Sequence, residues 1–206
     1  MKTRVIYVES SQFSRSEKSR IEKSVRLVSA DSSKMFRMYK PVNFVFYRFG
    51  KRLRGLAQAK DWITVTLPKG KIDYVDLESV VYHELHHIVR GYTEYLEKGE
   101  HFLLNSLFSE GLAVMLQIEK RVHKNRSYRY SPVLVRKWIP KMKKELYSTT
   151  YDYQAWFQGK GKPARLGYRI GKYLIDEIRK YHPNLTHVDL VKKNARDLLK
   201  LSKVKF

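Results

Sequence analysis

Residues 74–90 have the sequence YVDLESVVYHELHHIVR, and Gly91 follows them. Asp73 or Asp76 can cap a helix over this stretch, because a carboxylate oxygen accepts hydrogen bonds from the first backbone N–H groups. Gly91 stands where a helix C-terminus favours a left-handed residue. The two ends therefore predict a helix that runs to about Arg90.

Two histidines lie four positions apart in this helix. His83 and His87 then project from one face, about a turn apart, and both imidazoles can reach a single Zn²⁺ at about 2.0–2.1 Å. In an H-E-x-x-H sequence the glutamate, here Glu84, is no ligand but is placed to take a proton from water. We therefore expect a catalytic zinc site with His83 and His87 as ligands and Glu84 as general base.

A carboxylate further along the chain is the expected third ligand. Glu110 lies 23 positions after His87, within the apolar run LLNSLFSEGLAV at 103–114. Burying a carboxylate without a partner is costly, and zinc would be that partner. The alternative is a glutamate that reaches solvent at a helix start. Two His, one Glu and an open position form the shell of a catalytic zinc, one ion per chain.

Other polar residues are candidates for supporting roles. His86 points off the ligand face, so it either holds a ligand in place or is partly exposed. Arg90 either pairs with a buried carboxylate or is an exposed charge that suits the helix dipole. His101 falls in a loop-like stretch and can approach the site, although a surface position is the simpler interpretation.

The sequence GYRIG at 167–171 offers a further catalytic candidate. Gly167 and Gly171 lie on one helix face, and because they have no side chains this face can pack closely on another element. Packing against the zinc helix would bring Tyr168 or Arg169 towards a developing oxyanion. The alternative for Tyr168 is a plain packing role.

The composition fits a folded chain with a real core. Of 206 residues, 43% are hydrophobic and 13% aromatic. There is no cysteine, which excludes thiolate zinc sites and cysteine nucleophiles. No apolar run is long enough to span a membrane, and the N-terminus is not a signal peptide. We therefore expect a cytoplasmic protein, and the oligomeric state stays open.

The net charge of +22 suggests a second class of function. Residues 1–60 carry 15 Lys and Arg against 4 Asp and Glu, and residues 119–206 carry 23 against 7. Residues 61–118, which hold the expected site, carry 4 against 9. The basic flanks are either a solvated exterior or a binding surface for nucleic acid, anionic lipid or an acidic partner.

The remaining periodicity predicts a mixed first half and a helical second half. In the first half we expect strands at 5–8, 42–49 and 62–67 and a helix at about 14–29, which Ser14 and Glu17 cap. In the second half we expect helices at 103–117, from Ser131 onward with a break or kink at Pro140, and at about 163–181. A last capping box is formed by Thr186 and Asp189.

Three segments carry a family resemblance: HELHHIVR at 83–90, SEGLAV at 109–114 and GYRIGKYLI at 167–175. With them the chain resembles the gluzincins, and more narrowly an uncharacterised microbial family of predicted Zn-dependent proteases. The likeness covers about residues 60–201. Ser106 stands four positions before Glu110, where thermolysin-like enzymes have Asn, so the gluzincin branch stays open.

The resemblance implies an α+β, zincin-like fold with a cleft between two lobes of one catalytic domain, 1–206. Residues 1–91 would form a twisted sheet with the zinc helix, and residues 92–206 a helical lobe that bears Glu110. It also implies an edge strand that pairs with extended substrate, for which residues 62–67 are the candidate.

The expected function is zinc-dependent hydrolysis of a peptide or protein. The alternative is a non-enzymatic binder of nucleic acid or an anionic surface on the same scaffold. A weaker third option is a latent protease that needs a partner or processing to open.

Overall fold

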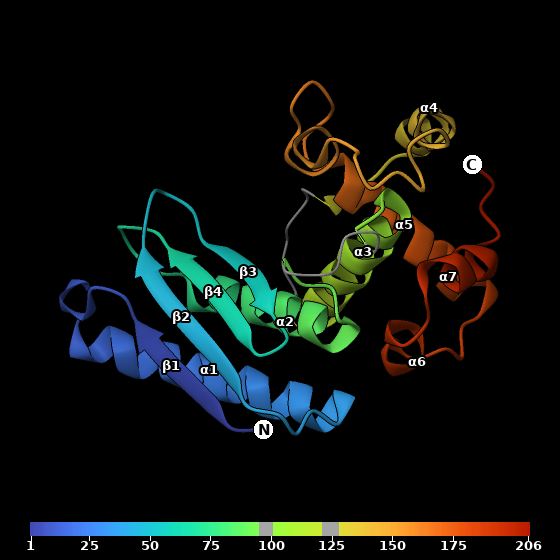
Figure 1. Cartoon of the computed structure of the whole chain (residues 1–206). Helices are drawn as coiled ribbons and strands as arrows, with labels where there is room; N and C mark the ends of the chain where they lie inside the picture. The colour runs from blue at the N-terminus through green and yellow to red at the C-terminus, as the bar shows by residue number, and fades with distance from the viewer. Residues whose placement is uncertain (95–100, 121–127) are drawn as a thin grey trace. The chain divides into compact units, whose positions relative to one another are not determined.

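The computed structural model describes residues 1–94, 101–120 and 128–206 (Figure 1). The chain divides into two compact units. Unit 1 comprises Met1–Leu96 and Leu116–His123, and unit 2 comprises Glu97–Met115 and Lys124–Phe206. The α+β class is confirmed, because unit 1 holds a small mixed sheet and the elements described in unit 2 are helical. The finer expectations, a zincin-like fold and a single domain in two lobes, stay predictions.

Unit 1 is built on four strands: β1 (Thr3–Tyr7), β2 (Val42–Arg48), β3 (Arg54–Ala59) and β4 (Trp62–Leu67). Their order in the sheet is β1-β2-β4-β3. β1 pairs with β2 and β2 with β4 in parallel, whereas β3 pairs with β4 in antiparallel. The helix between β1 and β2 provides the crossover that a parallel pair requires.

β4 is an inner strand, so the expectation that residues 62–67 form an edge strand is wrong. β2 pairs with one side of β4 and β3 with the other. The sequence did not predict β3, because RGLAQA contains none of the β-branched or aromatic residues that favour strands. The edge that lies next to β4 is therefore β3.

Two long helices complete unit 1, α1 (Arg15–Phe36) and α2 (Tyr74–Arg90), after the short 3-10 turn η1 (Ser10–Gln12). The predicted capping box of Ser14 and Glu17 is present, and α1 continues beyond the expected end at 29. Asp73, not Asp76, caps α2, since its side chain accepts from the N–H groups of residues 75 and 76. Gly91 has φ 74° and ends the helix, as expected.

The core of unit 1 lies where these two helices pack on the sheet. Its fully buried residues include, from α1, α2 and the strands in turn, Ile21, Val25, Val28, Leu77, Val81, Leu85, Phe44, Phe46, Ile63, Val65 and Leu67. Burying such side chains is the main favourable term in folding, at roughly 1.5–3 kcal/mol each. The helix that bears His83 and His87 is therefore held against a rigid sheet.

Asp31 on α1 ties α2 to the end of a third helix within unit 1. Its Oδ2 accepts from the Tyr82 hydroxyl at 2.8 Å and from the Lys120 ammonium at 2.9 Å. Burial acts to raise the pKa of Asp31, but the hydrogen bonds from Lys120 and Tyr82 outweigh it and hold that pKa below its usual value. Tyr82 directly precedes His83, so this network steadies the backbone at the expected site.

Unit 2 contains most of α3 (Leu103–Lys120), then α4 (Pro132–Met142), a π-helical turn η3 (Gln154–Gln158), α5 (Leu166–Tyr181), α6 (His187–Val191) and α7 (Ala195–Ser202). Ser131 caps α4, and Pro140 lies inside that helix two residues before its end. The predicted box of Thr186 and Asp189 caps α6. Sequence patterns thus located α3, α4 and α5 to within a few residues, whereas η3 and α7 were not predicted.

Two glycines bring α3 and α5 into backbone contact in unit 2. A Cβ on Gly171 would lie 2.2 Å from the carbonyl oxygen of Leu107, and one on Gly111 would lie 2.4 Å from the carbonyl carbon of Gly171. A Cβ on Gly167 would meet the ring of Phe157 at 2.4 Å. The close packing expected of this face exists, and α3 is the helix that Gly171 approaches. This contact fixes the turn of α3 that carries Glu110.

Candidate metal centre

The side chains of His83 and His87 lie together on α2. Both are buried, and their ring centroids are 4.7 Å apart at an interplanar angle of 84°. The helix spacing produces this arrangement, since residues four apart lie on one face. Two imidazoles are therefore presented side by side, as the sequence predicted.

Glu110 joins these two histidines in one group of possible metal ligands. Each of the three residues is buried and offers one ligand atom, and these atoms lie within 4.8 Å of one another. Imidazole nitrogen and carboxylate oxygen are donors that zinc accepts at about 2.0–2.2 Å, so three such atoms can surround one ion. The donor set fits one zinc ion.

Glu84 is buried beside His83 but faces the sheet. Its Oε2 accepts a hydrogen bond of 2.9 Å from the backbone N–H of Ala57 on β3. Gly55, two residues earlier on β3, lies against the same side chain. Neither contact could be predicted from the sequence, because β3 itself was not predicted.

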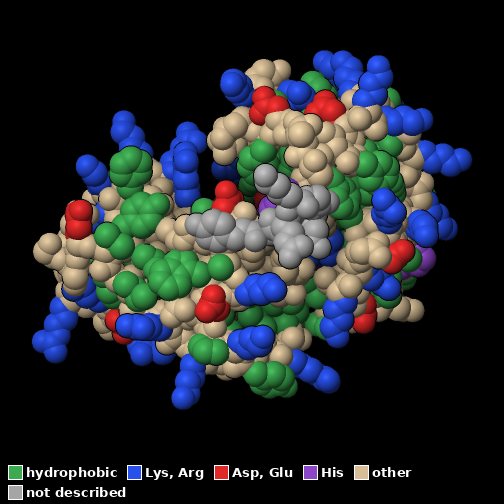
Figure 2. All heavy atoms as spheres, in the orientation of Figure 1, with side chains coloured by type: hydrophobic (Ala, Val, Ile, Leu, Met, Phe, Trp, Pro, Cys, Tyr) green, Lys and Arg blue, Asp and Glu red, His purple; other side chains and the backbone are tan. Residues whose placement is uncertain are grey.

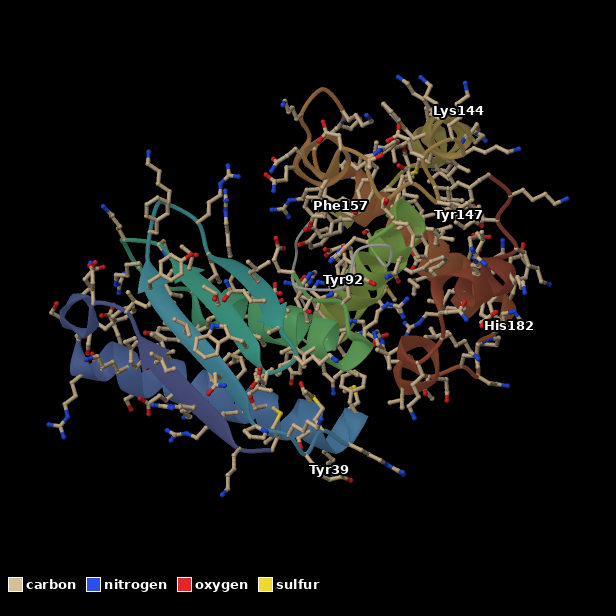
Figure 3. All side chains as sticks on the ribbon, viewed as in Figure 1. Tyr39, Tyr92, Lys144, Tyr147, Phe157 and His182 are labelled. Atoms are coloured by element: carbon tan, nitrogen blue, oxygen red, sulfur yellow. The ribbon has the colours of Figure 1, made fainter. Side chains whose placement is uncertain are left out.

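The end of α2 places three more polar or aromatic groups near the histidines. His86 is fully buried, which excludes the partly exposed alternative, and its ring meets that of Phe36 at 6.1 Å. Tyr92, labelled in Figure 3, lies with its ring centroid 5.3 Å from that of His87. Arg90 is half-buried, and desolvation of its guanidinium lowers the pKa to about 10. Whether His86 or Arg90 supports a ligand stays a prediction.

The phenol that contacts Glu110 belongs to Tyr153, which the sequence did not single out. Its hydroxyl donates to Oε1 of Glu110 at 3.4 Å. The ring of Tyr153 stacks on Phe157 with centroids 4.7 Å apart, which holds the phenol in place (Phe157 is labelled in Figure 3). Tyr153 precedes a π-helical turn with no motif around it, so periodicity could not have found it.

The remaining candidates lie in or near the same helical unit. The ring of Tyr168 packs on Phe157 at 5.4 Å and on Tyr128 at 5.8 Å, as its packing alternative expects. Arg169 is half-buried one residue later on α5, and His101 is half-buried two residues before α3. Catalytic or supporting roles for these three residues stay predictions.

The similarity to known proteins bears on what this group of side chains binds. A model of the family described as "Predicted Zn-dependent protease (DUF2268)" matches residues 18–200. The chain belongs to this family. The match contains α2, α3 and α5, and thus all three possible ligands.

No curated protein and no solved structure matches the chain. Among the residues that the structure describes, no helix is long and apolar enough to cross a membrane.

We predict that Tyr153→Phe weakens zinc binding about tenfold, because a group that hydrogen-bonds a ligating carboxylate orients it for the metal. Competition with a chromogenic chelator measures the affinity. Tyr151→Phe is the matched control, since its hydroxyl lies 2.6 Å from the Ser106 hydroxyl. Equal zinc affinities of parent and Tyr153→Phe would show that this phenol does not orient Glu110.

Proposed function

We propose that the chain hydrolyses peptide bonds at a zinc ion held by His83, His87 and Glu110, with Glu84 as general base. The observation that carries the proposal is the group of three buried donors whose ligand atoms lie within 4.8 Å of one another. Membership of a family of predicted Zn-dependent proteases supports the same reaction.

The proposed chemistry divides between the metal and the protein. When bound, zinc supplies a Lewis acid that polarises a carbonyl and makes water more acidic. Glu84 takes the proton of the attacking water as the C–O bond forms, and returns it to the amide nitrogen as the C–N bond breaks. Burial keeps bulk water away from this carboxylate, so the proton it holds passes to the leaving group.

Extended substrate is proposed to pair with β3. Within the described sheet β3 has only β4 as a neighbour, so its other side is an edge to which a peptide strand can add. At Ala57 this side is already used, because its N–H donates to Glu84 and its carbonyl accepts from the N–H of Glu94 at 2.9 Å. Pairing is therefore expected at residues that precede Ala57.

We predict that Glu84→Gln retains one zinc per chain and loses peptide hydrolysis by about 10²–10⁴-fold, because a carboxamide cannot accept the proton. His83→Ala should lose the zinc and the activity together. Metal analysis and hydrolysis of quenched fluorescent peptides measure the two effects. If Glu84→Gln cleaves as fast as the parent, Glu84 is not the base.

A second candidate function rests on a cluster of lysines around two tryptophans in unit 2. Trp138 on α4 and Trp156 in η3 meet edge to face with centroids 5.9 Å apart. Lys137 and Lys141 lie 5.9 and 5.2 Å from the ring of Trp138, and Lys162 lies 4.5 Å from that of Trp156.

This lysine–tryptophan cluster belongs to a strongly basic surface. Residues 120–144 contain no Asp or Glu, and Arg136, Lys137, Lys141, Lys143 and Lys144 on and after α4 are exposed. Figure 3 shows Lys144 beside α4, and in Figure 2 Lys and Arg side chains project at many points of the visible face. Such a surface is suited to attract a polyanion.

For this second function we predict salt-dependent binding to polyanions that does not need the metal. Replacement of Lys137, Lys141 and Lys162 by Gln should weaken binding to short single-stranded DNA or to vesicles with anionic lipid, because phosphate contacts are lost. Replacement of Lys40, Lys51 and Lys69, exposed residues of unit 1, removes the same charge and is the control. Equal loss in both variants, or no binding at low salt, removes this candidate.

A further inference from the structure

The side chain of Glu84 lies against β3 at a position where only glycine fits. A Cβ on Gly55 would lie 2.4 Å from Cγ of Glu84, 2.6 Å from its Oε1 and 2.7 Å from Cγ1 of Val80. Real Cβ atoms do not approach other heavy atoms closer than about 3.0 Å. Gly55 lacks the positive φ found at other glycines of this chain, so space and not backbone conformation requires glycine here.

A glycine inside a strand normally weakens it, because it has no side chain to pack and loses more backbone freedom than other residues. Such a residue is often found where another group must approach the backbone closely. At Gly55 that group is the carboxylate of Glu84.

The same strand supplies the hydrogen bond that orients this carboxylate. The N–H of Ala57 donates to Oε2 of Glu84 at 2.9 Å, and the bond is buried. The carbonyl of Ala57 accepts from the N–H of Glu94, which lies four residues after the end of α2. The peptide groups of Ala57 are thus held on both sides by segments connected to the helix that bears Glu84.

We propose that Gly55 and Ala57 are positioning residues for the general base. Gly55 leaves the space into which the Glu84 side chain fits, and the N–H of Ala57 selects one of its rotamers. A glutamate has three rotatable bonds, and general-base catalysis needs its oxygen within hydrogen-bond reach of the reacting water. β3 removes this freedom before substrate binds. The proposal rests on the proposed function in one respect, namely that Glu84 is the base.

Amide hydrogen exchange of Ala57, followed by NMR on the full chain, tests the contact without any assay of activity. The expected result is exchange at least about tenfold faster in Glu84→Ala, which removes the acceptor, and in Gly55→Ala, which pushes it away. Glu84→Gln retains an acceptor oxygen and should keep the protection. Gly70→Ala is the matched control, since a Cβ there meets no atom within 4 Å.

Steady-state kinetics of Gly55→Ala then shows whether Gly55 positions the Glu84 side chain or only contributes to the stability of the fold. We expect kcat to fall about 10–100-fold while KM and zinc content stay near those of Gly70→Ala, even where the contact with Val80 lowers the melting temperature. A purely structural role would lower the melting temperature and the zinc affinity together, because His83 and His87 share the helix with Glu84.

The two measurements test different parts of the proposal. Unchanged exchange of Ala57 in both Glu84→Ala and Gly55→Ala overturns the contact, as does an equal acceleration of every β3 amide. Unchanged kcat in Gly55→Ala overturns the positioning role. A parent protein that holds zinc but cleaves no peptide counts against the proposed function, whereas the exchange result still decides whether β3 holds Glu84.

Discussion

The rest of the site depends on one constraint, the burial of ionisable side chains in apolar surroundings. His83, Glu84, His87 and Glu110 are each at most 8% exposed. An isolated buried carboxylate is costly by several kcal/mol, so each of these acids needs a compensating partner. For Glu84 one partner is the N–H of Ala57, and for Glu110 one partner is the hydroxyl of Tyr153. A zinc ion bound by Glu110 and the two histidines would be a further partner of Glu110.

A closely packed glycine lies beside each of the two acids, Glu84 and Glu110. The two glycines belong to different elements of the fold. Gly55 of β3 lets the strand approach the side chain of Glu84. Gly111 follows Glu110 directly and meets Gly171 of α5, so that two helices touch through their backbones. The contact of Gly111 with Gly171 leaves little room for movement, because backbone atoms cannot rotate away as side chains can. Because glycine has no side chain, these positions allow the close contacts that hold Glu84 and Glu110 in place.

Local sequence patterns were sufficient to predict the five longest helices and the possible ligands. The box of Ser14 and Glu17, the cap at Asp73 and the stop at Gly91 each act within one turn, so neighbouring residues identify them. Glu110 could be proposed because a carboxylate in an apolar run needs a partner.

What the sequence could not predict depends on contacts between distant residues. β3 has no strand signal of its own and is stabilised by pairing with β4, so both the strand and its position at the edge were missed. Ala57 and Glu84 are 27 positions apart, and Tyr153 and Glu110 are 43 apart. No local pattern links such pairs, and their partners appear only in the folded chain.

Anomalous scattering at the zinc edge from crystals of the zinc-loaded protein tests whether His83, His87 and Glu110 bind one zinc ion. We predict one strong peak per chain, about 2.0–2.2 Å from a ring nitrogen of His83, a ring nitrogen of His87 and a carboxylate oxygen of Glu110. A zinc ion bound elsewhere, or one held by the two histidines while Glu110 points away, would contradict this prediction.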